Sequence, residues 1–365
     1  MNERRIIALL GRRDQPTDAV EEYCGYLGRA LRAHGIETKL ERVHWAENGW
    51  ADALRELRQK AEAWRSTWVL IQYTALAWSE RGFPLRFLRV VDALRYAGAR
   101  VGVVYHDVEA YAGLRWVDKA RRWSQLHTMR RALRAADLAV FTVPLSVVRW
   151  LDSPPAKAAF IPVGANLPVC PSNATEQIER EPGAFRVAVF GITGGMAGRN
   201  ESARIAEAVR FAAAQVGRLQ LYAFGRHADD CETALREGLR DAPVEVLVEG
   251  VLPPEQVVQR LSSSDVMLFV RGPISSRRGS AIAGIACGLP VIAYAGSETA
   301  PPITEAGVVL VSPEKPAALG EALVRVLEDA NYRGSLAEQS RVAYAQHFAW
   351  EAITSRYVQA LSSTS

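Results

Sequence analysis

Short apolar runs alternate with longer amphipathic segments along most of this chain. The runs have the length of β-strands, and the segments between them place apolar residues at helical spacing. This alternation is typical of a parallel sheet covered by helices on both faces. We therefore expect an α/β protein with strands at residues 5–10, 38–43, 68–73, 100–105, 138–142 and 159–162, and again at 185–191, 219–225, 244–248, 266–270, 290–293 and 308–310.

The alternation is interrupted once, at a polar stretch rich in proline around residues 169–182. A chain of 365 residues is also too long for one compact core. We expect two doubly wound, Rossmann-like domains at residues 1–168 and 184–347, joined by a linker at 169–183. Such sheets bind ligands at the carboxyl ends of their strands, so the two domains are expected to face a cleft.

Composition narrows the class of protein. The net charge of +4 comes mainly from arginine, which indicates either phosphate binding or a biased composition, and it is too small to argue for nucleic acid. Four scattered cysteines and the lack of a signal-like or membrane-spanning run favour a cytoplasmic protein. Histidine and cysteine do not cluster, so we expect no metal and no cofactor.

Two segments of the second half are candidate phosphate sites. Gly191, Gly194 and Gly195 lie in a strand-to-helix turn, with Arg199 just after it. In the second segment, a helix begins at small residues, where unpaired N–H groups attract anions. The candidate residues around that helix start are Arg277, Arg278, Gly279, Ser280 and Ala281. Gly225, Arg226 and Arg271, at the ends of the strands at 219–225 and 266–270, are candidates as well.

The first half offers a histidine and a basic helix. His106 and Asp107 follow the strand at 100–105, so they are expected at its carboxyl end, where a histidine can contact a substrate hydroxyl or phosphate. Residues 113–137 combine tryptophan with arginine and lysine. This pattern fits either an anionic membrane surface or a solvated helix whose tryptophans turn to the core; helical spacing alone does not separate the two.

Two motifs give the chain a family resemblance. Residues 283–293 read AGIACGLPVIA, and residues 348–353 read FAWEAI. With weaker matches at residues 161–166 and at His106-Asp107, they resemble glycosyltransferase family 4, retaining enzymes of the GT-B fold. The resemblance implies a last helix at 348–365 that crosses back to the first domain. It also implies an acceptor-side loop in the first domain, here Gly11, Arg12 and Arg13.

The chain also departs from that family. Its pair of donor-site glutamates, seven residues apart, is replaced by Ser275 and Ala283, and Ile192 and Ala197 stand at its basic positions in the glycine turn. We therefore hypothesise that the positive charge for the leaving diphosphate has moved to the loop before Gly279. Arg278 is then the strongest candidate, and with His106 and Asp107 it completes the predicted catalytic set.

The resemblance implies a metal-independent hexosyltransferase that uses a nucleoside diphosphate sugar. Its acceptor would be a glycan, in cell-envelope or polysaccharide synthesis. Independently of the resemblance, the basic and aromatic residues of 115–134 allow peripheral contact with the inner face of the membrane, and such contact would favour a lipid-linked glycan as acceptor. Two alternatives remain open at this point. One is a catalytically impaired GT-B homologue that acts as a binding or scaffold subunit, and the other is a sugar-nucleotide epimerase of the same fold.

Overall fold

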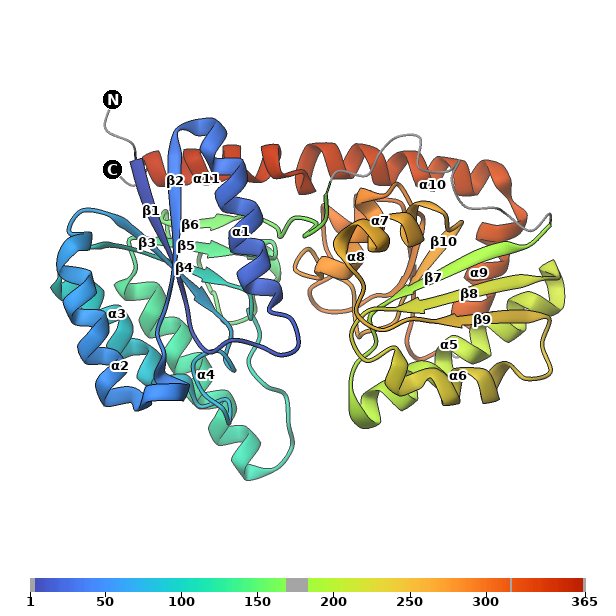
Figure 1. Cartoon of the computed structure of the whole chain (residues 1–365), viewed down its shortest axis with the longest axis horizontal. Helices are drawn as coiled ribbons and strands as arrows, with labels where there is room; N and C mark the ends of the chain where they lie inside the picture. The colour runs from blue at the N-terminus through green and yellow to red at the C-terminus, as the bar shows by residue number, and fades with distance from the viewer. Residues whose placement is uncertain (1–3, 169–182, 316, 364–365) are drawn as a thin grey trace. The chain divides into compact units, whose positions relative to one another are not determined.

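The structure of the protein is a computed structural model that describes residues 4–168, 183–315 and 317–363. The chain divides into two compact units (Figure 1). Unit 1 spans Met1–Pro162 and Trp350–Ser365, and unit 2 spans Val163–Ala349. Except for Gly183, the predicted linker lies outside the described residues, and the predicted cleft between domains stays a prediction.

Unit 1 is built on a six-stranded parallel sheet in the order β2-β1-β3-β4-β5-β6. Its strands are β1 (Arg4–Leu10), β2 (Ile36–Arg42), β3 (Trp68–Tyr73), β4 (Arg100–Tyr105), β5 (Leu138–Phe141) and β6 (Ala158–Phe160). Its helices are α1 (Ala19–Leu31), α2 (Trp45–Ala61), α3 (Phe87–Tyr96), α4 (Trp116–Ala135) and α11 (Trp350–Ser363). One face of the sheet packs against α2, α3 and α4, and α1 packs against α11 (Figure 1).

Unit 2 repeats the architecture with a six-stranded parallel sheet in the order β12-β11-β10-β7-β8-β9. Its strands are β7 (Phe185–Phe190), β8 (Leu219–Phe224), β9 (Val244–Val248), β10 (Val266–Phe269), β11 (Val291–Tyr294) and β12 (Val308–Val311). Its helices are α5 (Gly195–Val216), α6 (Glu232–Leu239), α7 (Pro254–Ser262), α8 (Gly279–Ala286), α9 (Ala318–Glu328) and α10 (Ala330–Ala343). The predicted α/β, doubly wound architecture is confirmed, and each predicted strand is present.

Local sequence explains where the first helix begins and ends. Asp18 caps α1: its carboxylate accepts hydrogen bonds from the N–H groups of Val20 and Glu21, both at 3.1 Å. Gly35 ends the 3₁₀ turn that follows α1, with a left-handed φ of 66°. The chain therefore places the start of α1 directly after the loop that leaves β1.

The cysteines and tryptophans of the chain differ in how far they are buried. Cys24 and Cys231 are core residues, Cys287 is half-buried, and Cys170 lies outside the described residues. Trp64, Trp68 and Trp78 are buried. The interpretation that the tryptophans of residues 113–137 turn to the core is wrong, because Trp116 and Trp123 are exposed. Within the described ranges, no helix combines the length and the apolar character needed to cross a bilayer.

Candidate functional site

The glycine turn after β7 lets two side chains approach bare backbone. Gly191 has a left-handed φ of 78°, and a Cβ atom there would lie 2.9 Å from Nη1 of Arg271. A Cβ atom on Gly194 would lie 3.1 Å from the ring of His227. Glycine at these positions therefore leaves room for a guanidinium and an imidazole at the carboxyl ends of β7, β8 and β10.

Arg271 lies in a mixed electrostatic environment beside this turn. Burial lowers the pKa of its guanidinium, nearby Arg226 lowers it further, and Glu201 opposes both. The Glu201 carboxylate is itself engaged, since it accepts hydrogen bonds from the N–H (2.8 Å) and the hydroxyl (2.7 Å) of Thr193. Across the described parts of the chain, no group hydrogen-bonds the Arg271 guanidinium, so an anionic ligand would find a suitable partner there.

Two helices begin beside these arginines without a side-chain cap. Gly194, which has no side chain, precedes α5, and Arg278 precedes α8. No side chain at either position accepts a hydrogen bond from the first N–H groups of the helix, and neither first turn contains an acidic residue. Their first N–H groups and dipoles therefore favour an anion. Gly195 and exposed Arg199 belong to the first turns of α5, and Gly279, Ser280 and Ala281 to that of α8.

The structure separates the two neighbouring arginines before α8. Arg277 donates two hydrogen bonds to the buried Glu298 carboxylate, at 2.6 and 3.1 Å, and Ser275 donates a third at 3.2 Å. Arg278 instead extends toward Gly272, where a Cβ atom would lie 3.7 Å from its Nη2. Arg277 is therefore balanced by Glu298, whereas Arg278 lies at the start of α8, as the sequence suggested.

In unit 1, His106 lies in a buried network. Its Nε2 is 2.8 Å from Oε1 of Gln72, whose amide nitrogen donates to Leu70 O at 3.2 Å. This orientation of the amide assigns the imidazole proton to Nε2. The ring also packs edge-on against Tyr23, whose hydroxyl is 2.8 Å from that of Tyr357 on α11. The last helix thus supports the element that packs on His106.

A pocket of about 260 Å³ lies at the carboxyl ends of β1, β3 and β4. Gly11, Arg12, Arg13 and Asp107 line it together, so residues that the sequence predicted separately meet here. His106 is not among its lining residues and is 9% exposed. Asp107 accepts a hydrogen bond from Ala75 N at 2.8 Å, which ties the loop after β3 to the same edge.

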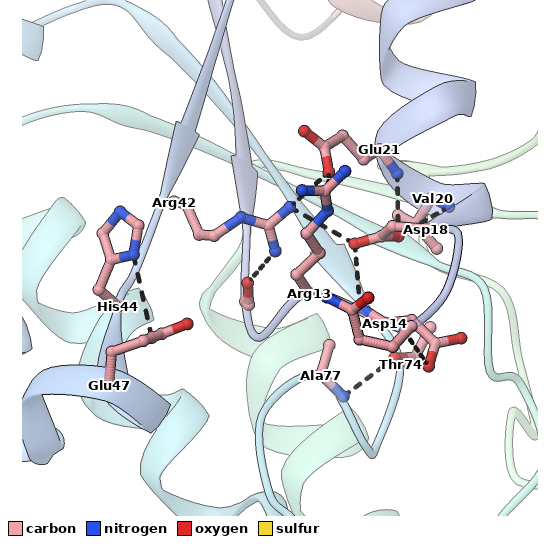
Figure 2. A network of polar contacts seen from close by, with 12 residues as sticks. Arg13, Asp14, Asp18, Val20, Glu21, Arg42, His44, Glu47, Thr74 and Ala77 are labelled. Carbon is pink, nitrogen blue, oxygen red and sulfur yellow. Dashed lines mark hydrogen bonds and ion pairs between the residues drawn. The ribbon is translucent and has the colours of Figure 1, made fainter.

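The charges of this pocket are largely balanced, as Figure 2 shows. Arg42 donates to Asp18 (3.4 Å), to Glu21 (3.0 Å) and to the carbonyl of Gly11. Arg13 forms an ion pair with Glu21 at 3.2 Å. Among the residues with described positions, none pairs with the half-buried Arg12 side chain. The lining contributes three arginines and three aspartates, so a polar ligand without net charge would fit this arrangement.

Sequence reasoning missed several supporting residues. Glu201, His227, Glu298 and Gln72 each hold or approach a predicted site residue. Each is a polar residue without a motif, and only the fold brings it to the site. Within the described ranges, no three His, Cys, Asp or Glu residues group to hold a metal ion.

Comparison with known proteins bears on the fold and on the second half of the chain. Residues 188–329 match the family model described as glycosyl transferases group 1. Among curated proteins, no sequence match is found.

The whole chain is similar to several solved structures. HepE from Anabaena, in complex with UDP and glucose, has a TM-score of 0.69 at 16% identity, over 98% of this chain and 99% of HepE. Sucrose-phosphate synthase from Thermosynechococcus elongatus has a TM-score of 0.70 at 19% identity, over 99% and 98%. A Listeria monocytogenes protein described as a UDP-N-acetylglucosamine 2-epimerase has a TM-score of 0.63 at 14% identity, over 99% and 96%.

At these identities the structural likeness establishes the fold. The predicted GT-B fold is confirmed, and the family match covers the part of unit 2 that contains Gly191, Arg271 and Arg278. The chain therefore has the GT-B fold, and its residues 188–329 match the model of group 1 glycosyl transferases.

Proposed function

We propose that this protein is a retaining glycosyltransferase that transfers a sugar from a nucleoside diphosphate sugar to an acceptor hydroxyl. The observation that carries the proposal is the position of Arg271. Its guanidinium lies against the glycine turn at the uncapped start of α5, inside the segment that matches the glycosyltransferase family. Because the leaving diphosphate gains negative charge as the glycosidic bond breaks, cations and N–H groups held there lower the barrier.

Arg271, Arg278 and the starts of α5 and α8 are the proposed diphosphate site. Arg226 adds a second guanidinium near Arg271, and His227 lies against Gly194, where it can contact the phosphate or the sugar. HepE was crystallised with UDP and glucose, which makes uridine donors the first to test. We further propose that these protein groups provide the charge stabilisation without a metal ion.

The pocket of unit 1 is the proposed acceptor site. Asp107 and Arg12 line it, and a carboxylate with a guanidinium suits the hydroxyls and ring substituents of a sugar. We propose a glycan or lipid-linked acceptor, in cell-envelope or polysaccharide synthesis. His106 would contact the donor sugar or phosphate, while its Nε2–H donates a hydrogen bond to Oε1 of Gln72.

The test combines a ligand screen with turnover. Melting shifts are measured with UDP-, GDP-, ADP- and dTDP-sugars, since a ligand at a hundred times its Kd adds about 2.7 kcal/mol to the free energy of unfolding. Sugar transfer is then measured with the stabilising donor, with and without EDTA, for the wild type, for Arg271→Ala and for Arg236→Ala. Arg236 is an exposed arginine of α6 paired with Glu232, so it serves as the control.

The proposal predicts stabilisation by one donor class, transfer that resists EDTA and loss of both in Arg271→Ala alone. The epimerase neighbour makes isomerisation a second candidate, and isomerisation of the donor without any acceptor would replace our proposal with it. Stabilisation by a donor that is never turned over would instead indicate a binding subunit.

A further inference from the structure

The amino-terminal end of α4 exposes a group of large apolar side chains. Leu114 is 94% exposed, Trp116 80% and Trp123 62%. The other seven tryptophans of the chain, all within the described residues, are buried or half-buried. Exposure of tryptophan is therefore confined to one short segment, which we call the α4 ridge: Leu114, Arg115, Trp116, Lys119, Arg122 and Trp123.

The buried face of α4 is polar from Asp118 to Thr128, and it becomes apolar only near the end of the helix, at Met129, Ala132 and Leu133. Ser124, Gln125 and Thr128 are buried, whereas Trp116 and Trp123 point outward. Gln125 uses its amide to hold the preceding loops, accepting from Tyr111 N at 2.7 Å and donating to Gly82 O at 2.9 Å. Folding alone gains nothing from exposed tryptophan, so this arrangement indicates a surface built to contact something.

The ridge is regular and basic. Trp116 and Trp123 are seven residues apart, so they share one face of the helix about 10 Å apart along its axis, with Lys119 between them. The single acid of α4, Asp118, is buried and bound to Arg115 (3.1 Å) and Arg121 (3.0 Å). The exposed side of α4 continues with further cations at Arg130, Arg131 and Arg134. No carboxylate of α4 thus offsets them.

The ridge lies at the same edge of unit 1 as the pocket. In a parallel sheet, each helix begins at the edge where the preceding strand ends. β4 ends just before Asp107, which lines the pocket, and α4 then begins at Trp116. Because α4 is about 30 Å long and β4 about 20 Å, its amino-terminal end projects beyond the sheet, as Figure 1 shows.

We propose that the α4 ridge docks unit 1 on an anionic membrane surface. Tryptophan rings insert at the boundary between lipid headgroups and acyl chains, while lysine and arginine attract anionic headgroups from above it. Docking at this edge brings the pocket close to the bilayer. If the pocket is the acceptor site, as in the proposed function on which this step rests, its position close to the bilayer favours an acceptor carried by a lipid.

The test uses flotation of the full chain with vesicles of phosphatidylcholine alone or with about a third phosphatidylglycerol, where anionic lipid supplies the attraction. The variants are Trp116→Ser/Trp123→Ser and Lys119→Glu/Arg122→Glu. The control is Tyr96→Ser, since Tyr96 is 94% exposed at the far end of α3. Circular dichroism and the melting shift with the donor are recorded for each variant.

We expect binding to the anionic vesicles that high salt weakens, at least a tenfold loss in both double variants, and no loss in Tyr96→Ser. No binding by the wild type at low salt, equal binding to neutral vesicles, undiminished binding by the double variants, or tighter binding to duplex DNA than to vesicles would each overturn the docking proposal. Donor stabilisation that persists in a chain unable to bind vesicles separates failure here from failure of the proposed function.

Discussion

The two units treat the start of a helix beside their ligand edge in opposite ways. In unit 1, α1 is capped by its own carboxylate, Asp18, which also pairs with Arg42. In unit 2, α5 begins after Gly194, which offers no side-chain acceptor. In unit 1, the Asp18 carboxylate thus accepts hydrogen bonds from the first N–H groups of α1 and pairs with Arg42. In unit 2, the first N–H groups of α5 remain available to a ligand.

The arginines of the two units also differ in how far neighbouring acids balance their charge. Arg42 and Arg13 form ion pairs with acids of the same unit. Arg271 has one acid, Glu201, and a second arginine, Arg226, near it, and burial lowers the pKa of its guanidinium. An edge with balanced charge suits the hydroxyls of a sugar, and one with excess positive charge suits a diphosphate. Two sheets of the same architecture are therefore expected to bind different ligands, the acceptor sugar in unit 1 and the donor diphosphate in unit 2.

The largest effect is expected for the arginines of unit 2. Arg271→Ala and Arg278→Ala should each lower kcat about a hundredfold to a thousandfold, because each removes a donor aimed at developing charge. Steady-state kinetics with the donor identified by the screen measures this loss. Arg236→Ala should turn over normally, and kinetically normal Arg271→Ala and Arg278→Ala enzymes would remove the diphosphate site from unit 2.

A smaller effect is expected in unit 1 from His106. His106→Ala should lower kcat/KM about tenfold to a hundredfold, the cost of one or two lost polar contacts to the substrate. The matched control is His44→Ala, because the His44 side chain is 43% exposed and lies 3.9 Å from Glu47, away from the network of Gln72. Unchanged turnover in His106→Ala would leave this histidine a purely structural role.

The sequence predicts the sheets better than it predicts the site. Strands such as β5 and β10 are apolar throughout because both of their faces are buried, and that signal is local. The adjacent arginines Arg277 and Arg278 look alike in sequence. They are distinguished by Glu298, which lies 21 residues further along the chain and pairs with Arg277, and no local pattern carries that information.

The same reasoning explains the tryptophans of α4. Trp116 and Trp123 recur at a spacing that fits either an inward or an outward face, so periodicity leaves their direction open. The deciding residues are Ser124 and Thr128, whose buried side chains take the inner face. Because the first part of the inner face of α4 is polar, the orientation of that part cannot be read from its apolar residues.

Arg277 and Arg278, which directly precede α8, are expected to differ when they are replaced: loss of Arg277 should lower stability without weakening donor binding. Arg277→Ala should lower the free energy of unfolding by about 1–3 kcal/mol, because it leaves the buried Glu298 carboxylate without its charged partner. Urea unfolding measures this change. If Arg277→Ala unfolds like the wild type but loses donor binding, Arg277 belongs to the diphosphate site after all.

The smallest effect tests the cap itself. Asp18→Ala should lower the free energy of unfolding by about 1 kcal/mol, since the cap of α1 is lost. Asp52→Ala removes an exposed acid of α2 paired with Arg55, and it should change stability by less than about 0.5 kcal/mol.

If the cap is what separates the two units, its removal should also make the start of α1 resemble that of α5. Arg42 then loses one of its two acids, and inorganic phosphate near its Kd should raise the stability of Asp18→Ala by about 0.4 kcal/mol more than that of the wild type. Thermal melts in phosphate and in chloride of equal ionic strength measure this difference. An equal response in both proteins would show that the preference of unit 2 for anions comes from its arginines and not from the open start of its helices.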